Sequence, residues 1–329
     1  MKDPRESLLS IEPKKECGRI SEFIKEQAKS FRRDGAVVGL SGGVDSAVAA
    51  ALCVEALGRE HVFGLILPEK ESSPLSLEYA RRHAEGMGIP HEIVDITPVL
   101  ERVGTYEKRD EAVRSVYQDL RPGDKIKLSL PPDILEKDAL NIFSLSIVRG
   151  DELVFRCRLN KDQLNSIVAA TNTKQRTRML HLYYWADKLN SLVCGTTNRS
   201  ELVQGFFVKY GDGGVDIEPI AHLYKMQVYQ LAAELNVPLE IIERAPSPDT
   251  FSWETSDEEF FFRMPYEKLD PLLWAWEKNL KPAEAGELLG LSEDQVRRAF
   301  RDFEAKHRAA RHLLSQPPML DGPMRGDPP

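Results

Sequence analysis

The feature that most constrains the fold is a short apolar run that ends in a glycine pair and passes directly into a helix-forming stretch. Residues 36–40 read AVVGL, the next six read SGGVDS, and AVAAALCVEAL follows. A short run of small and β-branched apolar residues is typical of a strand buried in a parallel sheet. A strand that stops at Gly42-Gly43 and turns at once into a helix exposes backbone N–H groups and the positive end of a helix dipole. The segment therefore predicts a βα unit with an anion site at its turn.

The same alternation of strand and helix patterns continues along much of the chain. The pattern predicts helices at residues 14–33, 75–87, 98–120 and 162–190, and further strands at residues 61–67, 91–96 and 191–194. Strands separated by helices predict an α/β fold, a doubly wound, Rossmann-like parallel sheet with helices on both faces. In such sheets, ligands bind beyond the carboxyl ends of the strands, where the Gly42-Gly43 turn is expected.

The alternation breaks between about residues 123 and 159. Three short β-like runs, KIKLSL, NIFSLSIV and ELVFRCRL, are separated there by turn signals and predict a β-rich insertion. The main domain is then expected at residues 1–122 and 160–265, with a C-terminal helical part of the same domain at 266–315. The last 14 residues hold five Pro and two Gly, so we expect residues 316–329 to be a disordered tail.

Charge and cysteine usage narrow the class of protein. The 329 residues carry 44 Lys and Arg against 52 Asp and Glu, and this net charge of −8 argues against nucleic acid or an anionic membrane as a partner. The longest apolar stretches fall short of the ~20 residues of a membrane span, and the N-terminus has no signal-peptide core. Four widely spaced cysteines without a CxxC pair predict reduced thiols in a cytoplasmic protein.

The turn at residues 41–46 differs from the commonest phosphate-binding loops. No GxxxxGK[ST] occurs in the chain, and no GxGxxG follows a strand. Taken alone, the turn is either an anion-binding loop, in which Asp45 can hold magnesium, or a βα turn capped by Asp45 or Ser46. SGGVDS resembles the SGGxDS loop of the ATP pyrophosphatase group, which is adenine nucleotide alpha-hydrolase-like. The resemblance implies cleavage of ATP between its α- and β-phosphates and transfer of AMP to an oxygen.

A second set of motifs selects one family within that group. Residues 195–201 read GTTNRSE, residues 205–216 read GFFVKYGDGGVD, and PIAHLYK ends at Lys225. Upstream, residues 174–179 read KQRTRM, and residues 246–249 read PSPD downstream. In order and spacing these segments are similar to the GT-x-N-x-SE, GFF-x-KYGDGG-x-D, P-x-x-x-L-x-K, KARxRM and PTAD or PSAD motifs of NAD synthetases. The chain thus resembles the ammonia-dependent NAD synthetase family.

The resemblance implies roles for individual residues. Asp45 and Glu201 are expected to share a magnesium ion, and Lys225 to supply positive charge near the reacting phosphoryl group, so these three are the expected catalytic residues. ATP contacts are expected at Gly39, Leu40, Ser41, Gly42, Gly43, Val44, Asp45, Ser46, Thr196, Lys225 and Ser247. Deamido-NAD contacts are expected at Arg176, Lys209 and Asp216. The family's C-terminal His-Lys pair has two counterparts, Lys306-His307-Arg308 and Arg311-His312, and the sequence leaves the choice open.

The reaction implied by the family is the amidation of deamido-NAD with ATP and ammonia, which yields NAD, AMP and diphosphate. Glutamine-dependent members carry an N-terminal glutaminase domain, whereas only about 35 residues precede the first predicted strand here. We therefore expect ammonia to be used free or delivered by a separate glutaminase subunit. Mg²⁺ is the expected cofactor, and a homodimer is the expected assembly.

Three other functions stay open on the sequence. The insertion and residues 250–264 depart from the family pattern where a mobile loop covers the active site, so a relative that amidates another carboxylic acid is the main alternative. A tRNA-modifying ATP pyrophosphatase would show a basic groove and often paired cysteines, and the net charge of −8 and the scattered cysteines count against it. A non-catalytic nucleotide sensor would lack an acidic residue or the phosphate loop, whereas Asp45, Glu201 and Lys225 are all present here. Taken singly, Lys209 and Lys225 would be solvated surface charges and Arg176 an ion-pair residue.

Overall fold

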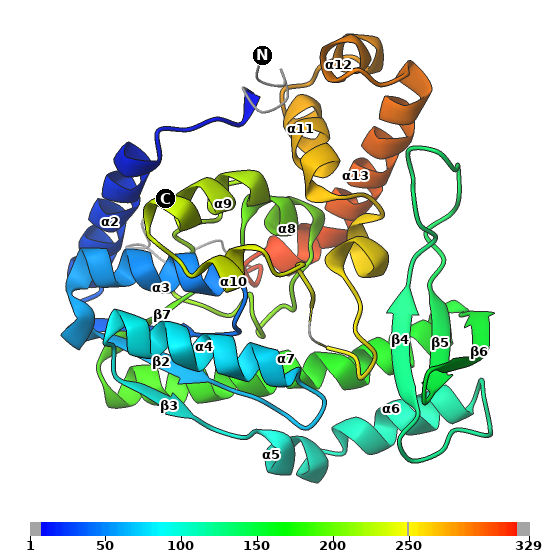
Figure 1. Ribbon diagram of the computed structural model, residues 1–329, viewed down its shortest axis with the longest axis horizontal. Helices are drawn as coiled ribbons and strands as arrows, with labels where there is room; N and C mark the ends of the chain where they lie inside the picture. The colour runs from blue at the N-terminus through cyan, green and yellow to red at the C-terminus, as the bar shows by residue number, and fades with distance from the viewer. Residues whose placement is uncertain (1–7, 249, 321–329) are drawn as a thin grey trace.

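A four-stranded parallel sheet lies at the centre of the computed structural model, which describes residues 8–248 and 250–320 (Figure 1). The strand order is β3-β2-β1-β7. The strands are β1 (Gly35–Gly39), β2 (Val62–Ile66), β3 (His91–Ile93) and β7 (Ser191–Cys194). In β1, Ala36 pairs with Val62 on one side and with Leu192 on the other, so β1 lies between two parallel neighbours. The chain order reverses at β1, and this topological switch point is where ligands bind in open α/β sheets.

Helices cover both faces of this sheet, as the α/β prediction requires. One face packs Ala36 and Val38 against α2 (Pro13–Ser30), α3 (Val44–Leu57), α4 (Pro74–Met87), α9 (Lys225–Glu234) and α10 (Leu239–Ile242). The opposite face packs Val37 and Leu65 against α5 (Thr97–Arg102), α6 (Thr105–Arg114) and α7 (Lys161–Lys188). Residues 36–38 are fully buried, because apolar side chains meet them from both sides. The doubly wound prediction is confirmed.

Some of the predicted element boundaries were wrong. The helix expected at residues 98–120 is two helices, α5 and α6, because Gly104 between them adopts a left-handed conformation (φ 75°) that a helix does not continue. The strand expected at 91–96 ends at Ile93. The first helix ends at Ser30, before Arg32, which also has a positive φ (54°).

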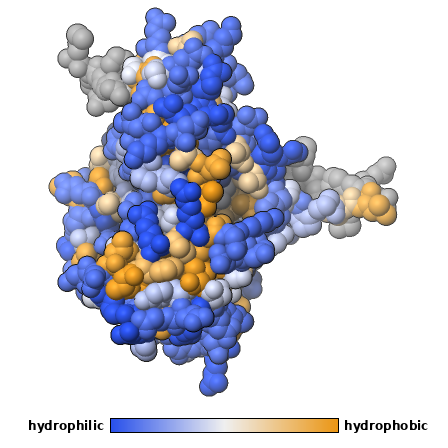
Figure 2. Space-filling view, turned by 90° about the vertical axis from the view of Figure 1, so that its right-hand side faces the viewer, coloured by the Kyte–Doolittle hydropathy of each residue, from blue (hydrophilic) through white to orange (hydrophobic). Residues whose placement is uncertain are grey.

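The β-like runs form a separate antiparallel sheet, which we call the arm (residues 123–159). Its strands are β4 (Lys125–Ser129), β5 (Ser144–Arg149) and β6 (Glu152–Arg158), in the order β4-β5-β6. Its strands share a small hydrophobic core with α7, which includes Leu128 of β4, Leu145 of β5 and Ile167 of α7. Figure 2 faces the side of the molecule on which the arm and the last helix lie, and hydrophobic side chains gather there among hydrophilic ones. In Figure 1 the arm lies to one side of the central sheet, beside α6 and α7, whose residues Val113 and Ile167 share its core.

The C-terminal part is helical and packs over α8 (Arg199–Gln204). It comprises a π-helical turn (Glu258–Phe262), α11 (Tyr266–Glu277), α12 (Pro282–Leu289) and α13 (Glu293–Leu314). Residues 316–320 form no helix or strand, and the rest of the predicted tail, residues 321–329, lies outside the described residues. Within the described residues, no helix is both long and apolar enough to cross a membrane.

Candidate active site

The phosphate-binding loop predicted at residues 41–46 joins β1 to α3. Gly42 has φ 78°, and a Cβ there would lie 2.3 Å from the carbonyl oxygen of Ser76, so only glycine fits. Ser46 Oγ donates to the Gly43 carbonyl (3.0 Å) and accepts from the Ser41 N–H (3.2 Å), which fixes the turn. The N-cap of α3 is Gly43, and no side chain caps the helix. The alternative in which Asp45 or Ser46 caps α3 is therefore wrong, and the first N–H groups of a 14-residue helix stay available to an anion.

Three charged residues predicted from the motifs meet beside this loop, and with Asn198 we call them the Lys225 centre. The Lys225 ammonium lies 2.5 Å from Asp45 Oδ2 and 3.7 Å from Glu201 Oε1. Asn198 Nδ2 donates to the other Asp45 oxygen at 3.1 Å. Asp45 follows β1 and Glu201 follows β7, so the carboxyl ends of two adjacent strands bring the two acids together. The structure thus brings together the three charged residues that the motifs selected.

Charges in the Lys225 centre influence one another strongly. Burial works against a charge on Lys225, but the carboxylates of Asp45 and Glu201 raise its pKa above the ordinary lysine value, so it stays cationic. Burial and the negative charge of Asp45 raise the pKa of Glu201. Two acids that face one ammonium thus leave an excess of negative charge, which an additional cation would neutralise.

Lys225 is the first residue of α9, and buried hydrogen bonds to α11 of the C-terminal part hold the start of this helix in place. Asp270 of α11 accepts from Ser200 Oγ (2.6 Å) and from the Met226 N–H (2.8 Å). Ser200 Oγ in turn accepts from the Lys225 N–H at 3.3 Å. Burial raises the pKa of Asp270 to about 7. The helical C-terminal part therefore helps to hold Lys225 in place.

Asp257 is a further acid near the centre that motif analysis did not select. Its carboxylate accepts from Tyr266 Oη at 2.9 Å and is 5% exposed. Burial raises the pKa of Asp257 to about 6, although the charge of Lys225 acts in the opposite direction. The only sequence signal for this residue was the partial family match at Ser256-Asp257-Glu258.

A cleft of about 850 Å³, a size typical of small-molecule sites, opens beside the loop after β2. Its described lining includes none of residues 39–46 and neither Glu201 nor Lys225. Arg244 lines this cleft and donates to Ser76 Oγ (2.9 Å), the residue against which Gly42 packs. Ser247, expected to contact ATP, also lines it. The remaining walls come from the loop after β2, from α6, from the start of the arm and from residues 250–255. The cleft therefore lies between the loop after β2 and the arm, and the contact of Arg244 with Ser76 connects it to Gly42 of the phosphate loop.

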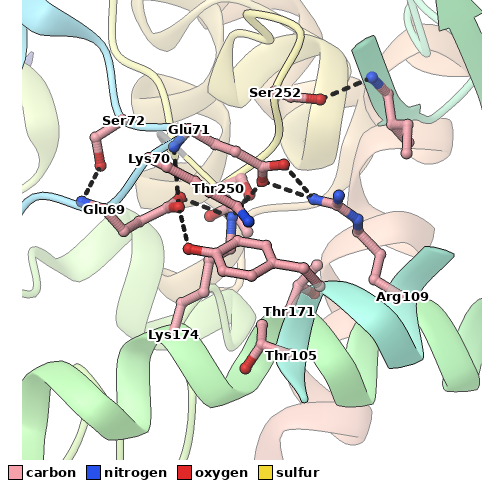
Figure 3. Close-up of polar contacts among 12 residues, drawn as sticks. Glu69, Lys70, Glu71, Ser72, Thr105, Arg109, Thr171, Lys174, Thr250 and Ser252 are labelled. Carbon is pink, nitrogen blue, oxygen red and sulfur yellow. Dashed lines mark hydrogen bonds and ion pairs between the residues drawn. The ribbon is translucent and has the colours of Figure 1, made fainter. Parts of the chain in front are cut away.

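The floor of the cleft is built on a second buried lysine, Lys174, which Figure 3 shows among its partners. Its ammonium donates to Glu69 Oε1, to Glu71 Oε2 and to the Thr250 carbonyl, each at 2.8 Å. Tyr106 Oη donates to Glu69 (2.7 Å), and Arg109 donates to Glu71 (2.6 Å). We call the five side chains of Glu69, Glu71, Tyr106, Arg109 and Lys174 the Lys174 cluster. Burial opposes the charge of Glu71, but Lys174 and Arg109 lower its pKa below the ordinary value.

The residues expected to hold deamido-NAD lie elsewhere. Arg176 Nε donates to the Lys209 carbonyl (3.3 Å), so these two residues are neighbours. Asp216 instead accepts from Tyr183 Oη (3.1 Å) and from the Val193 N–H (2.8 Å), and no described hydrogen bond or ion pair joins it to the other two. Among the described residues, the lining of the cleft includes none of the three.

The two candidate C-terminal basic pairs are in different surroundings. Lys306 is buried, forms an ion pair with Asp302 (2.7 Å) and donates to the Phe261 carbonyl. The end of α13, which holds His312, reaches Lys209, whose ammonium donates to the His312 carbonyl at 2.7 Å. The second pair is therefore the one that lies beside an expected substrate residue. Thr196, the remaining expected ATP contact, is half-buried in the loop after β7.

Sequence reasoning missed the roles of Lys174, Glu69, Glu71 and Asn198. Lys174 and Asn198 belong to motifs that were recognised, yet nothing local assigns them partners. Glu69 and Glu71 follow β2 at the same sheet edge as the phosphate loop, and that position was the one available signal. Asp249, the last residue of the PSPD motif, lies outside the described residues.

Comparison with protein families and relatives gives a consistent result. A family model described as NAD synthase matches residues 16–123 and 141–312. The unmatched stretch, residues 124–140, holds β4 and much of the connection to β5. An NH3-dependent NAD+ synthetase of Mesorhizobium japonicum is 44% identical over 311 residues, which cover 94% of this chain and 97% of that protein. The enzyme of the same description from Thermotoga maritima is 42% identical over 257 residues and covers 78% of this chain and 85% of its own.

Solved structures agree in fold. An NH3-dependent NAD synthetase from Campylobacter jejuni, in complex with the nitrate ion, matches with a TM-score of 0.62 at 25% identity. The match covers 94% of this chain and 100% of that one. An NMN synthetase from Francisella tularensis has a TM-score of 0.64 at 24% identity, over 94% of this chain and 99% of its own, and shows the shared fold.

Proposed function

The chain belongs to the NAD synthase family, and we propose that it is a ligase that makes NAD from deamido-NAD, ATP and ammonia. The observation that carries the proposal is the Lys225 centre, where Asp45, Glu201 and Lys225 meet beside a glycine turn at the switch point of the sheet. The four cysteines of the chain form no disulfide, as expected of a cytoplasmic enzyme.

The chemistry follows from the charges of the reaction. A carboxylate resists attack by ammonia because its oxygen is a poor leaving group. Attack of that carboxylate on the α-phosphate of ATP breaks the bond to diphosphate and forms an acyl-adenylate, and ammonia then displaces AMP to give the amide. The N–H groups at the start of α3 and the Lys225 ammonium stabilise the negative charge on the phosphates. The phosphate loop holds the phosphates in position for attack by the carboxylate. The chain's own contribution is therefore positioning and charge neutralisation.

Mg²⁺ fits the acidic side of the centre. Asp45 and Glu201 supply oxygen ligands from adjacent strand ends, and Mg²⁺ is usually held by one or two carboxylates plus substrate phosphates. When bound, the ion would neutralise phosphate charge.

Arg176 and Lys209 support deamido-NAD as the acceptor. The Arg176 guanidinium contacts the backbone of Lys209, so both cationic residues belong to one region of the surface, and a dinucleotide needs cations for its phosphates. Asp216 is the third expected contact. Two residues of α7 near Arg176, Leu180 and Tyr184, are each 59% exposed, and an exposed apolar surface of this kind supports a homodimer that covers α7.

The direct test is NAD formation by the purified protein from deamido-NAD, ATP and Mg²⁺, with ammonium or with glutamine as the nitrogen source. We expect product with ammonium and none with glutamine. Lys209→Ala should raise the KM for deamido-NAD about ten- to a hundred-fold with a smaller effect on ATP, because a charged contact to the acceptor is lost. Well-folded protein that makes no NAD yet releases AMP with another carboxylic acid would contradict the acceptor. Glutamine-supported turnover would contradict the nitrogen source.

A further inference from the structure

The outer edge of strand β4 in the arm is joined to a segment whose first part, residues 250–255, lines the cleft. We call residues 250–264 the wall segment. The Trp253 N–H donates to the Ile126 carbonyl (3.1 Å), and the Ile126 N–H donates to Ser252 Oγ (2.9 Å, Figure 3). Further along, the Leu130 N–H donates to the Glu259 carbonyl at 2.9 Å. Strand β4 thus has β5 on one edge and the wall segment on the other.

Side chains strengthen this edge contact. Lys127 Nζ lies 3.2 Å from Glu259 Oε1 and 4.0 Å from the centre of the Trp253 ring. Phe251, 5% exposed, is part of the same hydrophobic core as the arm strands. Trp253 and Phe251 line the cleft, whereas Lys127 does not. Lys127 therefore contacts the back of the wall, away from any ligand in the cleft.

The far end of the wall segment is anchored as well. Arg263, 1% exposed, donates to the Pro131 carbonyl (2.7 Å) and to Asn141 Oδ1 (2.6 Å), both in the connection between β4 and β5. Lys306 of α13 donates to the Phe261 carbonyl at 2.7 Å. The near end is held by Lys174, which donates to the Thr250 carbonyl. The segment that carries Asp257 toward the Lys225 centre is therefore fixed at both ends and along its length.

We propose that the arm is a positioning element that holds the wall segment in place against ATP, with Lys127 and Glu259 as positioning residues that act through Trp253. The inference rests on the proposed function, which places the ATP phosphates at the start of α3 and at Lys225. Of the expected ATP contacts, Ser247 lies in the described lining of the cleft, and Arg244 of the lining contacts Ser76 beside Gly42. The wall segment also carries Asp257, whose charge interacts with that of Lys225, and none of the residues expected to hold deamido-NAD is in the described lining. Loosening the wall segment should therefore weaken the binding of ATP more than the binding of deamido-NAD.

The test uses charge reversal in the full-length protein. K127E places two carboxylates in contact and should raise the KM for ATP about 3- to 10-fold, with the KM for deamido-NAD changed by less than about twofold. E259K places two ammonium groups in contact and should act in the same direction. The double variant K127E/E259K restores an opposite-charge pair and should return the KM for ATP to within about twofold of the original value. R156E, an equal charge change on the exposed far edge strand β6, is the matched control and should change neither KM.

Several results would overturn the inference. If R156E raises the KM for ATP as much as K127E does, net charge is the cause. If the KM for ATP stays raised in the double variant, the charge pair is not the cause. If the KM for deamido-NAD rises as much as the KM for ATP, Lys127 and Glu259 do not act on the ATP side of the wall segment. The dissociation constant of a non-hydrolysable ATP analogue, measured by calorimetry for the same four variants, tests the inference without turnover. Failure of the original protein to make NAD would thus count against the proposed function alone.

Discussion

Two buried lysines, Lys225 and Lys174, each face two carboxylates, and their surroundings differ in one decisive respect. Lys174 is fully buried and has three acceptors at 2.8 Å. Lys225 is 2% exposed, and of the described residues only Asp45 is within hydrogen-bond distance of its ammonium. An ammonium has three protons to donate. Lys174 uses all of them inside the protein, whereas Lys225 keeps donor capacity for a ligand.

The difference teaches how burial and function can be separated. A charge that is fully paired and hydrogen-bonded in the interior orders the elements around it, and Lys174 joins the loop after β2, α7 and the wall segment. A charge that is paired on one side alone is prepared to stabilise negative charge that arrives with a substrate. Buried lysine by itself is therefore no sign of catalysis, and the number of acceptors distinguishes the two roles.

The largest expected effect is on stability and comes from Lys174. Lys174→Met leaves Glu69 buried without a cation and Glu71 with Arg109 alone, so it should lower the free energy of unfolding by about 3–5 kcal/mol. Urea unfolding followed by circular dichroism measures this. At a temperature where the variant stays folded, kcat should remain within about tenfold of the original. A variant of unchanged stability would contradict a structural role for the cluster.

Lys225→Met should lower kcat strongly and change stability little, the opposite of Lys174→Met. It removes a preorganised cation from the phosphoryl group, and loss of one such stabiliser costs about 10²–10³-fold in kcat. The fold should survive, because the raised pKa of Glu201 lets that carboxyl take up a proton once Lys225 is gone. Single-turnover release of diphosphate, together with a thermal melt, measures both quantities. Full activity with reduced stability would show that the two lysines had been assigned the wrong way round.

Asp45→Asn sharpens the assignment further. The amide keeps the size of the side chain and removes its charge, so adenylation should fall at least ~10²-fold while the melting temperature changes little. The decisive measurement is AMP formation at saturating magnesium. Unchanged turnover in well-folded protein would remove Asp45 from the mechanism.

The smallest effect is the pH dependence of stability that Glu71 contributes. Its folded-state pKa is lowered below 4.5, so its contribution is present above that pH and is lost as the pH falls through the folded-state pKa. The stability difference between the original protein and Glu71→Gln should therefore be constant near neutral pH and should shrink in acid. Denaturant unfolding from pH 7 to pH 3 measures the difference. A difference that grew as the pH fell would contradict the sign.

The sequence by itself determined the central sheet, the phosphate loop and the three charges of the Lys225 centre. Strand and helix patterns are local, and the ends of adjacent parallel strands meet at one sheet edge, so motifs after β1 and β7 had to come together. The Lys174 cluster depended on tertiary structure, because Lys174 meets Glu69 and Glu71 across 105 and 103 residues of chain. The pairing of β4 with the wall segment spans 126 residues between Ile126 and Ser252. Contacts over such separations leave no local periodicity in the sequence, and only the packing of the arm, α7 and the wall segment together decides which polar groups become partners.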